Sequence, residues 1–144
     1  MSQARTDGVI EAMATLRRRC PWSSIQDHTS LEKYAREETE ELVEALDRFT
    51  AEASAGNRAA VVEELGDVFY QVLFHSALLD ESDSQDYGHT LGLILDGLEQ
   101  KLIRRHPLAF GDDGKDGEMP ALEYVEREYR RIKAEEKTAG ETQR

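Results

Sequence analysis

The chain has 144 residues, of which 39% are hydrophobic and 33% charged, and its formal net charge is −12 at pH 7. Its length and composition are typical of one folded domain. So negative a surface repels nucleic-acid phosphates and anionic membranes, and we expect it to bind neither. One cysteine excludes an intrachain disulfide, and no apolar run is long enough to span a membrane, so we expect a cytoplasmic protein.

Apolar spacing predicts five helices and no strand. They cover roughly residues 3–19, 29–53, 58–79, 87–105 and 120–137. Thr29 and Glu32 are expected to form a capping box at the start of the second helix. Residues 54–57 are expected to form a turn, and 111–117 a loop rich in Gly and Asp. Short loops between helices predict an all-α helical bundle, with residues 1–144 as a single domain and a flexible tail at 138–144.

The third predicted helix is apolar around most of its circumference, which is typical of a helix buried on most sides. Glu64, Asp67, Gln71 and His75 nevertheless fall on one line, at spacings of three and four residues. An isolated buried carboxylate is costly, so acids at these positions need a metal ion or a charged partner.

The second predicted helix supplies further acids. They are Glu37, Glu38, Glu40, Glu41 and Glu44. If residues 54–57 turn the two helices antiparallel, Glu38 and Glu41 can face Glu64 and Asp67. Mutual repulsion then requires cations, and ligand sets made only of oxygen atoms suit Mg²⁺ first and Mn²⁺ second.

Simpler interpretations exist for each half of this pattern. The acids of the second helix, taken alone, indicate a solvated acidic face. Glu64 and Asp67, taken alone, fit salt bridges to Arg or Lys as well as they fit a metal. The two halves together, with a turn between them, favour the metal site.

Several segments resemble motifs of the MazG-type nucleotide pyrophosphohydrolases, in the all-α NTP pyrophosphatase superfamily. The acids resemble the EExxE…ExxD signature of that family. Four other segments resemble its CPWD, QTH, KLxRRHP and WExxK motifs, and they begin at Cys20, Gln26, Lys101 and Tyr129. The similarity covers about residues 17–137, which we take as the core of the domain. Ser23, Asp27 and Tyr129 differ from the residues that are usual in the family, namely Asp, Thr and Trp.

The resemblance implies Mg²⁺-dependent hydrolysis of a nucleoside triphosphate to the monophosphate and pyrophosphate. It implies metal ligation by Glu38, Glu41, Glu64 and Asp67. Glu37 would hold a second metal or orient the attacking water, and Glu37 or Glu38 is the expected catalytic carboxylate. An intertwined homodimer, sometimes paired into a tetramer, is also implied. Such a dimer would complete a core like that of a four-helix bundle, and the apolar third helix independently favours oligomerisation.

Residues outside the acid motifs are candidates for binding the rest of the substrate. Lys101, Arg105 and Lys133 are expected to bind the outgoing pyrophosphate, although ordinary surface basicity is the simpler interpretation. The same resemblance assigns binding of the nucleoside to four residues, namely Trp22, Gln26, His28 and Tyr129. Trp22 would stack on the base while Gln26 or His28 reads its edge, but a Trp in this position can equally fill the core.

Three other functions compete with this hypothesis. One is a superfamily relative specific for dUTP or phosphoribosyl-ATP. Another is a carboxylate-bridged di-iron bundle, which requires Glu-x-x-His pairs that the chain lacks. The third is a non-enzymatic acidic interaction module, which would not need acids on an apolar helix. House-cleaning of the nucleotide pool is the physiological role that we expect.

Overall fold

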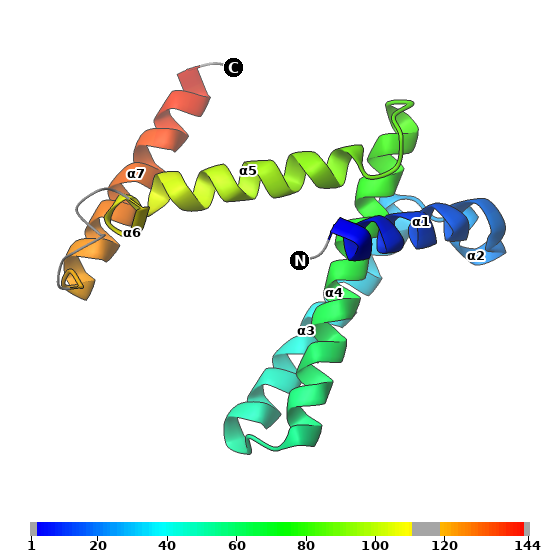
Figure 1. The fold of residues 1–144 in the computed structure, drawn as a ribbon, viewed down its shortest axis with the longest axis horizontal. Coiled ribbons are helices and arrows are strands. Elements are labelled where there is room, and N and C mark those ends of the chain that lie inside the picture. Colours follow the sequence, from blue (N-terminus) through cyan, green and yellow to red (C-terminus); the bar gives the residue numbers. More distant parts are fainter. Residues whose placement is uncertain (1–2, 111–118, 143–144) are drawn as a thin grey trace. The chain divides into compact units, whose positions relative to one another are not determined.

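The fold was analysed on a computed structural model, which describes residues 3–110 and 119–142. Every regular element in this part of the chain is a helix, which confirms the all-α prediction (Figure 1). The helices are α1 (Gln3–Arg19), α2 (Pro21–Ser24), α3 (His28–Ala51), α4 (Ala55–Ser82), α5 (His89–Arg105), α6 (Pro107–Phe110) and α7 (Leu122–Thr142). The predicted loop at 111–117 lies outside the described residues.

The helix count differs from the prediction because two short helices, α2 and α6, each follow a longer one directly. Both begin at a proline, a residue that is well suited to the first turn of a helix. At the C-terminus, α7 starts at Leu122, so Pro120 precedes the helix and does not lie in its first turn. The helix then continues to Thr142, and residues 138–142 of the expected tail are therefore helical.

The chain divides into two compact units, residues 1–92 and 93–144. α1 to α4 belong to the first unit, whereas α5 begins in the first and ends in the second. All the acidic residues that the sequence assigns to the site lie in the first unit. The proposed phosphate-binding residues, like Tyr129, lie in the second.

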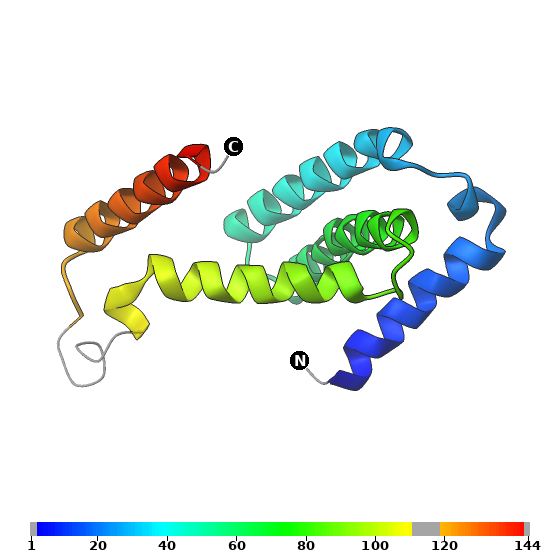
Figure 2. The same ribbon diagram turned by 90° about the horizontal axis from the view of Figure 1, so that it is seen from above.

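α3 and α4 lie side by side and antiparallel, joined by a very short connection (Figures 1 and 2). The connection is shorter than predicted, because α4 already begins at Ala55 inside the expected turn. Ser54 caps α4 by accepting a hydrogen bond from the backbone N–H of Asn57 at 3.1 Å. The Asn57 side chain donates in turn to the carbonyl of Glu52, at 2.8 Å. The antiparallel pairing that the acid hypothesis needed is therefore present.

The capping box predicted for Thr29 and Glu32 is wrong. Asp27 is the N-cap of α3, and its carboxylate accepts from the backbone N–H of Ser30 at 2.7 Å. The Ser30 hydroxyl completes the box by accepting from the Asp27 N–H at 3.0 Å. Aspartate and serine make this motif two residues earlier than the sequence pattern suggested.

The core of the first unit lies where α1, α3 and α4 meet. Met13, Leu31, Phe74 and Ala77 are almost completely buried there. Arg17 also joins α1 to the end of α4, through two hydrogen bonds of 2.7 Å to the carboxylate of Glu81. The Arg17 guanidinium lowers the pKa of Glu81, so this ion pair is maintained at neutral pH.

A buried carboxylate fixes the connection from α4 to α5. Asp80 is fully buried, and it accepts from the backbone N–H groups of Gly88 at 2.9 Å and Thr90 at 2.8 Å. These N–H groups lie at the start of α5, where negative charge is favourable. Gly88 has a φ of 99°, and a Cβ there would lie 2.9 Å from the side chain of Ile10, so only glycine fits.

In the second unit, Glu136 of α7 joins the last turn of α5. It accepts from Arg104 at 2.6 Å and from Arg105 at 2.7 Å. These two guanidinium groups, Arg105 first, lower the pKa of Glu136 to about 2. No helix in the described part of the chain is both long and apolar enough to cross a membrane.

Asp80→Ala should destabilise the protein strongly. It leaves two N–H groups at the start of α5 without an acceptor, and we expect a loss of about 3 kcal/mol in the free energy of unfolding. Urea denaturation monitored by circular dichroism measures this loss. Asp86→Ala, which removes an exposed aspartate from the same connection, is the control and should change stability little. Similar stabilities for the two variants would contradict the capping role of Asp80.

Candidate metal and active site

Three carboxylates converge between α3 and α4. One oxygen atom from each of Glu38, Glu41 and Glu64 lies within 4.8 Å of the other two. Glu38 and Glu41 share a face of α3 because they are three residues apart, and Glu64 reaches them from the antiparallel α4. The structure therefore brings together three of the four residues predicted to bind metal.

Burial, followed by the negative charges of its neighbours, raises the pKa of Glu38. Asp67 makes the largest of these charge contributions. The pKa of Glu64 is likewise raised, first by burial and then by the charges of Glu41 and Asp67. Asp67 thus lies outside the group of three but contributes to the same negative potential.

Salt bridges, the alternative explanation for these acids, are not found among the described residues. None of Glu38, Glu41, Glu64 and Asp67 forms an ion pair with another described residue. Arg48 is the cation that lowers the pKa of Glu64, but it makes the smallest contribution and pairs with Glu44 at 3.6 Å. The negative charge between the helices is therefore not neutralised by the described part of the chain.

The second carboxylate oxygen of Glu64, Oε2, is buried and has no hydrogen-bond partner. Leaving a buried carboxylate oxygen unsatisfied costs free energy, and a bound cation removes that cost. A set of ligands made only of carboxylate oxygens is also the chemistry that hard divalent cations prefer. The residues present therefore fit a site for Mg²⁺ or Mn²⁺.

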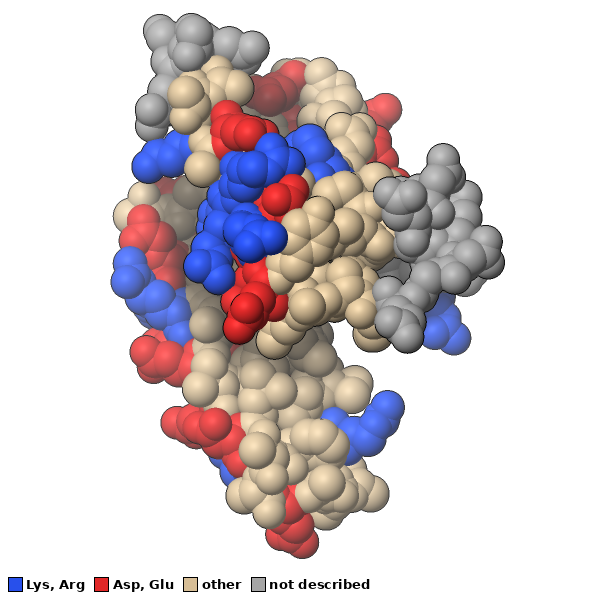
Figure 3. All heavy atoms as spheres, turned by 90° about the vertical axis from the view of Figure 1, so that its left-hand side faces the viewer, with Lys and Arg blue, Asp and Glu red and all other residues tan. Residues whose placement is uncertain are grey.

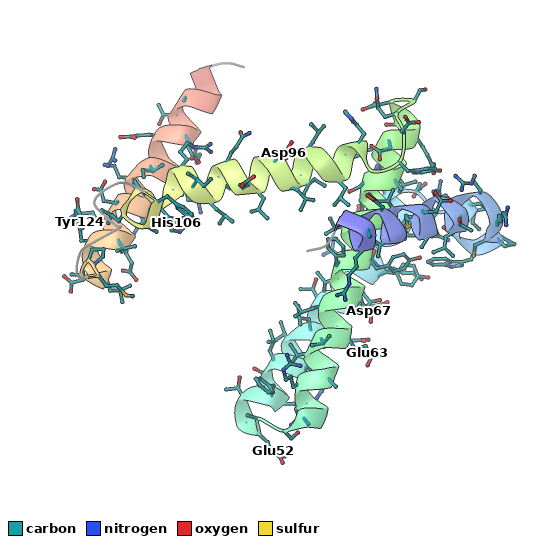
Figure 4. All side chains as sticks on the ribbon, viewed as in Figure 1. Glu52, Glu63, Asp67, Asp96, His106 and Tyr124 are labelled. Carbon is teal, nitrogen blue, oxygen red and sulfur yellow. The ribbon has the colours of Figure 1, made fainter. Side chains whose placement is uncertain are left out.

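The acids nearest to the cluster are not members of it. Glu37 is exposed on α3, and its charge makes the smallest contribution to the raised pKa of Glu38. Glu63 is exposed and lies about one turn of α4 before Asp67 (Figure 4). The catalytic role of Glu37 stays a prediction.

The polar line of α4 continues beyond Asp67 into the core. Gln71 is buried, and His75, one turn further, contacts His28 with 2.7 Å between the two Nδ1 atoms. The ring centroids are 5.0 Å apart and the planes differ by 4°. That spacing equals the Nδ1–Nδ1 distance plus one ring radius at each end, so the rings lie end to end in nearly one plane. Burial, and then the charge of His28, lowers the pKa of His75.

The residues proposed to bind the nucleoside make contacts within the protein. Trp22 packs edge-on against Tyr34 and Phe74, with centroids 5.6 Å and 6.2 Å away, yet it remains 42% exposed. Gln26 donates to the carbonyl of Trp22 at 2.9 Å and accepts from the Ser30 hydroxyl at 2.7 Å. Trp22 therefore covers the edge of the core and still exposes a ring surface, so stacking on a base remains a prediction.

The candidate phosphate-binding residues lie in the second unit. Arg105 is held by Glu136, and its guanidinium lies 3.4 Å from the hydroxyl of Tyr129. Lys101 and Lys133 are exposed. The face shown in Figure 3 likewise carries Lys and Arg side chains grouped with Asp and Glu. A phosphate would have to compete with Glu136 for Arg105, whereas the two lysines are accessible.

Two residues with structural consequences had no assigned role in the sequence. Gln71 stood on the polar line, but its burial next to the acids could not be read from spacing alone. The sequence pattern did not indicate a buried role for Asp80, because an aspartate near the end of a predicted helix is usually exposed. Its role depends on the path of the chain from α4 to α5.

Comparison with known proteins identifies the family of the chain. Residues 26–110 match the MazG nucleotide pyrophosphohydrolase domain. An uncharacterized 26.1 kDa protein of Streptomyces cacaoi is 40% identical over 93% of the chain and 50% of its own length. The nucleoside triphosphate pyrophosphohydrolase/pyrophosphatase MazG of Thermotoga maritima is 38% identical over 82% of the chain and 39% of its length. No solved structure gives a significant match.

The nucleoside triphosphate pyrophosphohydrolase of Escherichia coli K12 is 31% identical over 81% of the chain. That alignment covers 41% of the Escherichia coli protein, so the chain spans half or less of each of these three relatives. The matched domain includes α3 and α4, with all four acids that the sequence assigned to the metal. The chain belongs to the MazG nucleotide pyrophosphohydrolase domain family.

Proposed function

We propose that the protein hydrolyses nucleoside triphosphates, NTP or dNTP, to the monophosphate and pyrophosphate with Mg²⁺, and that Mn²⁺ can substitute. The observation that carries this proposal is the convergence of Glu38, Glu41 and Glu64 without a neutralising cation from the described part of the chain. Relatives with 38% and 31% identity are named as nucleoside triphosphate pyrophosphohydrolases, which supports the same reaction. House-cleaning of the nucleotide pool in the cytoplasm is the role that we propose.

The mechanism assigns separate tasks to the acids. When bound, a divalent cation supplies positive charge that offsets the charge of the phosphates. Glu38, Glu41, Glu64 and Asp67 hold the cation, while Glu37 or Glu38 orients the attacking water and accepts its proton. In the metal-free chain the pKa of Glu38 is raised, and a cation bound beside it would favour the ionised carboxylate.

Two further groups of side chains are proposed to bind the rest of the substrate. Lys101, Arg105 and Lys133 bind the departing pyrophosphate, so that negative charge does not accumulate on it. The exposed ring of Trp22 stacks on the base, with Gln26, His28 and Tyr129 near the nucleoside. The accessible lysines and the 42% exposure of Trp22 support these assignments.

We propose a homodimer, or a tetramer made of two such dimers. Large apolar side chains are exposed along both units. On α5 they are Leu93, Ile94, Leu95, Leu98, Leu102 and Ile103, each at least 39% exposed. Exposed apolar surface on this scale is typical of an interface, and a second copy of the chain would cover it.

Product analysis tests the reaction. With Mg²⁺ and a panel of NTPs and dNTPs, the protein should release the monophosphate and pyrophosphate, measured by chromatography and an enzyme-coupled pyrophosphate assay. Asp67→Asn should lower kcat/KM by about 100-fold, because it removes negative charge from the metal site. Glu63→Gln, one turn away on α4, is the matched control and should retain activity. Release of orthophosphate in place of pyrophosphate would refute the proposed reaction.

Glu38→Gln should stabilise the metal-free protein while it abolishes turnover. The folded-state pKa of Glu38 is raised, so its ionisation reduces stability as pH rises through that pKa. In EDTA at pH 7, the variant should unfold about 2 to 5 °C higher than the unmodified chain. The advantage should vanish below about pH 4, where this carboxyl is protonated even in the unfolded chain.

Differential scanning calorimetry at both pH values makes this measurement. Glu40→Gln removes an equivalent charge from the exposed side of α3 and is the control. A fall in the unfolding temperature of Glu38→Gln at pH 7 would show that the carboxylate is already neutralised without metal.

The dimer is tested by Leu98→Arg, which places a charge on the exposed apolar face of α5. We expect it to shift the protein from dimer to monomer, because a buried unpaired charge opposes association. Size-exclusion chromatography with light scattering measures the mass. Glu99→Arg, at the neighbouring exposed position, should leave the dimer intact. A monomeric unmodified protein would refute the proposal directly.

A further inference from the structure

Gln71 of α4 has a buried polar atom without a hydrogen-bond partner. Its side chain is only 8% exposed, and its carboxamide oxygen Oε1 is buried without a hydrogen-bond partner. Such an oxygen costs about 1–3 kcal/mol if it stays unpaired. Glu64 Oε2 has the same defect on the same helix. Two unpaired buried acceptors on α4 point to donors that the described residues do not supply.

The side chains that carry these two acceptors project from the same side of α4. Seven residues separate Glu64 from Gln71, which is almost two full turns of a helix. Glu64 meets Glu38 and Glu41 of α3, so this is the side of α4 that faces α3. Gln71 follows Asp67 by four residues, about 6 Å along the helix axis. It is therefore the next polar side chain beyond the acids, between α3 and α4.

The two unpaired polar atoms on this side of α4, Glu64 Oε2 and Gln71 Oε1, both accept hydrogen bonds. Carboxylates have no proton to donate, and the free atom of Gln71 is its carbonyl oxygen. A hydrated divalent cation has the opposite character, because each water that it retains presents two donors. Mg²⁺ in particular keeps several waters when proteins bind it.

We propose that Gln71 Oε1 accepts a hydrogen bond from a water on the cation that Glu38, Glu41, Glu64 and Asp67 hold. This inference rests on the proposed function, and it makes Gln71 a positioning residue for the hydrated metal. Residues that act on a metal through its other ligands typically change affinity by 10- to 100-fold. Binding of the hydrated cation would then give the buried amide oxygen of Gln71 the hydrogen bond that it lacks.

Ser23 provides an internal comparison. Its hydroxyl is also buried and unpaired, with 1% of the residue exposed, but it lies on α2 outside the α3–α4 pair. Removal of this hydroxyl should affect stability alone. Removal of the Gln71 carboxamide should affect both stability and metal binding.

The test measures Mg²⁺ binding by isothermal titration calorimetry on the full chain without nucleotide, together with unfolding temperatures in EDTA and in Mg²⁺. Gln71→Met keeps the length of the side chain but removes the acceptor. We expect it to weaken Mg²⁺ binding about tenfold and to raise the unfolding temperature in EDTA. Gln71→Glu should strengthen Mg²⁺ binding. It should lower the unfolding temperature in EDTA and give a larger increase in that temperature when Mg²⁺ is added.

Ser23→Ala is the matched control and should bind Mg²⁺ as the unmodified chain does. A measurement without any substitution guards against misfolded variants: the side-chain amide resonances of Gln71 should shift when Mg²⁺ is added. Opposite effects of Met and Glu on Mg²⁺ affinity distinguish this role from simple packing, which would make both substitutions destabilising without changing affinity.

Two results would overturn the inference, and they are distinguishable. If the unmodified chain binds Mg²⁺ but Gln71→Met binds it equally well, Gln71 has no contact with the hydrated metal and the proposed function survives. A raised KM for nucleotide in that variant would then assign the amide to the substrate. If the unmodified chain binds no Mg²⁺, both the inference and the metal-dependent function fail together.

Discussion

Repulsion among carboxylates is the interaction on which the rest of the structure depends. Glu38, Glu41 and Glu64 place oxygen atoms within 4.8 Å of one another, and the charge of Asp67 adds to their repulsion. Burial first, and then this repulsion, raises the pKa values of Glu38 and Glu64. A sequence that needed only a stable hairpin would place apolar or oppositely charged side chains at these positions. Acids there make sense when a cation is part of the folded, working protein.

The sequence predicted the helices and the acid pairing because both depend on local spacing. Glu38 and Glu41 share a face by periodicity, and the short connection near Ser54 leaves α4 no direction but back along α3. The capping box was misplaced because Thr29 with Glu32 and Asp27 with Ser30 fit almost the same pattern. Backbone conformation decides between such neighbours, and spacing alone does not contain it.

Contacts between distant segments could not be predicted. The end-to-end histidine pair joins residues 47 positions apart, and the Asp80 cap depends on how the chain turns at Gly88. The ion pair between Arg105 and Glu136 likewise joins residues that are 31 positions apart. Spacing correctly marked Arg105 as a cation at the end of a helix. It did not reveal that a carboxylate of the same chain already holds it.

Burial is distributed unevenly along the hairpin that carries the acids. Every buried residue of α4 lies at Gln71 or beyond, where α1 also packs. From Glu32 onward, α3 buries only Ala45. The half that holds Glu41 and Glu64 therefore has little apolar burial to offset its repulsion. A cation between the helices would supply the missing attraction there. Under the proposed function, the ion that would prepare the site for a triphosphate would also hold together the helices that form it, so the two consequences of metal binding could not be separated.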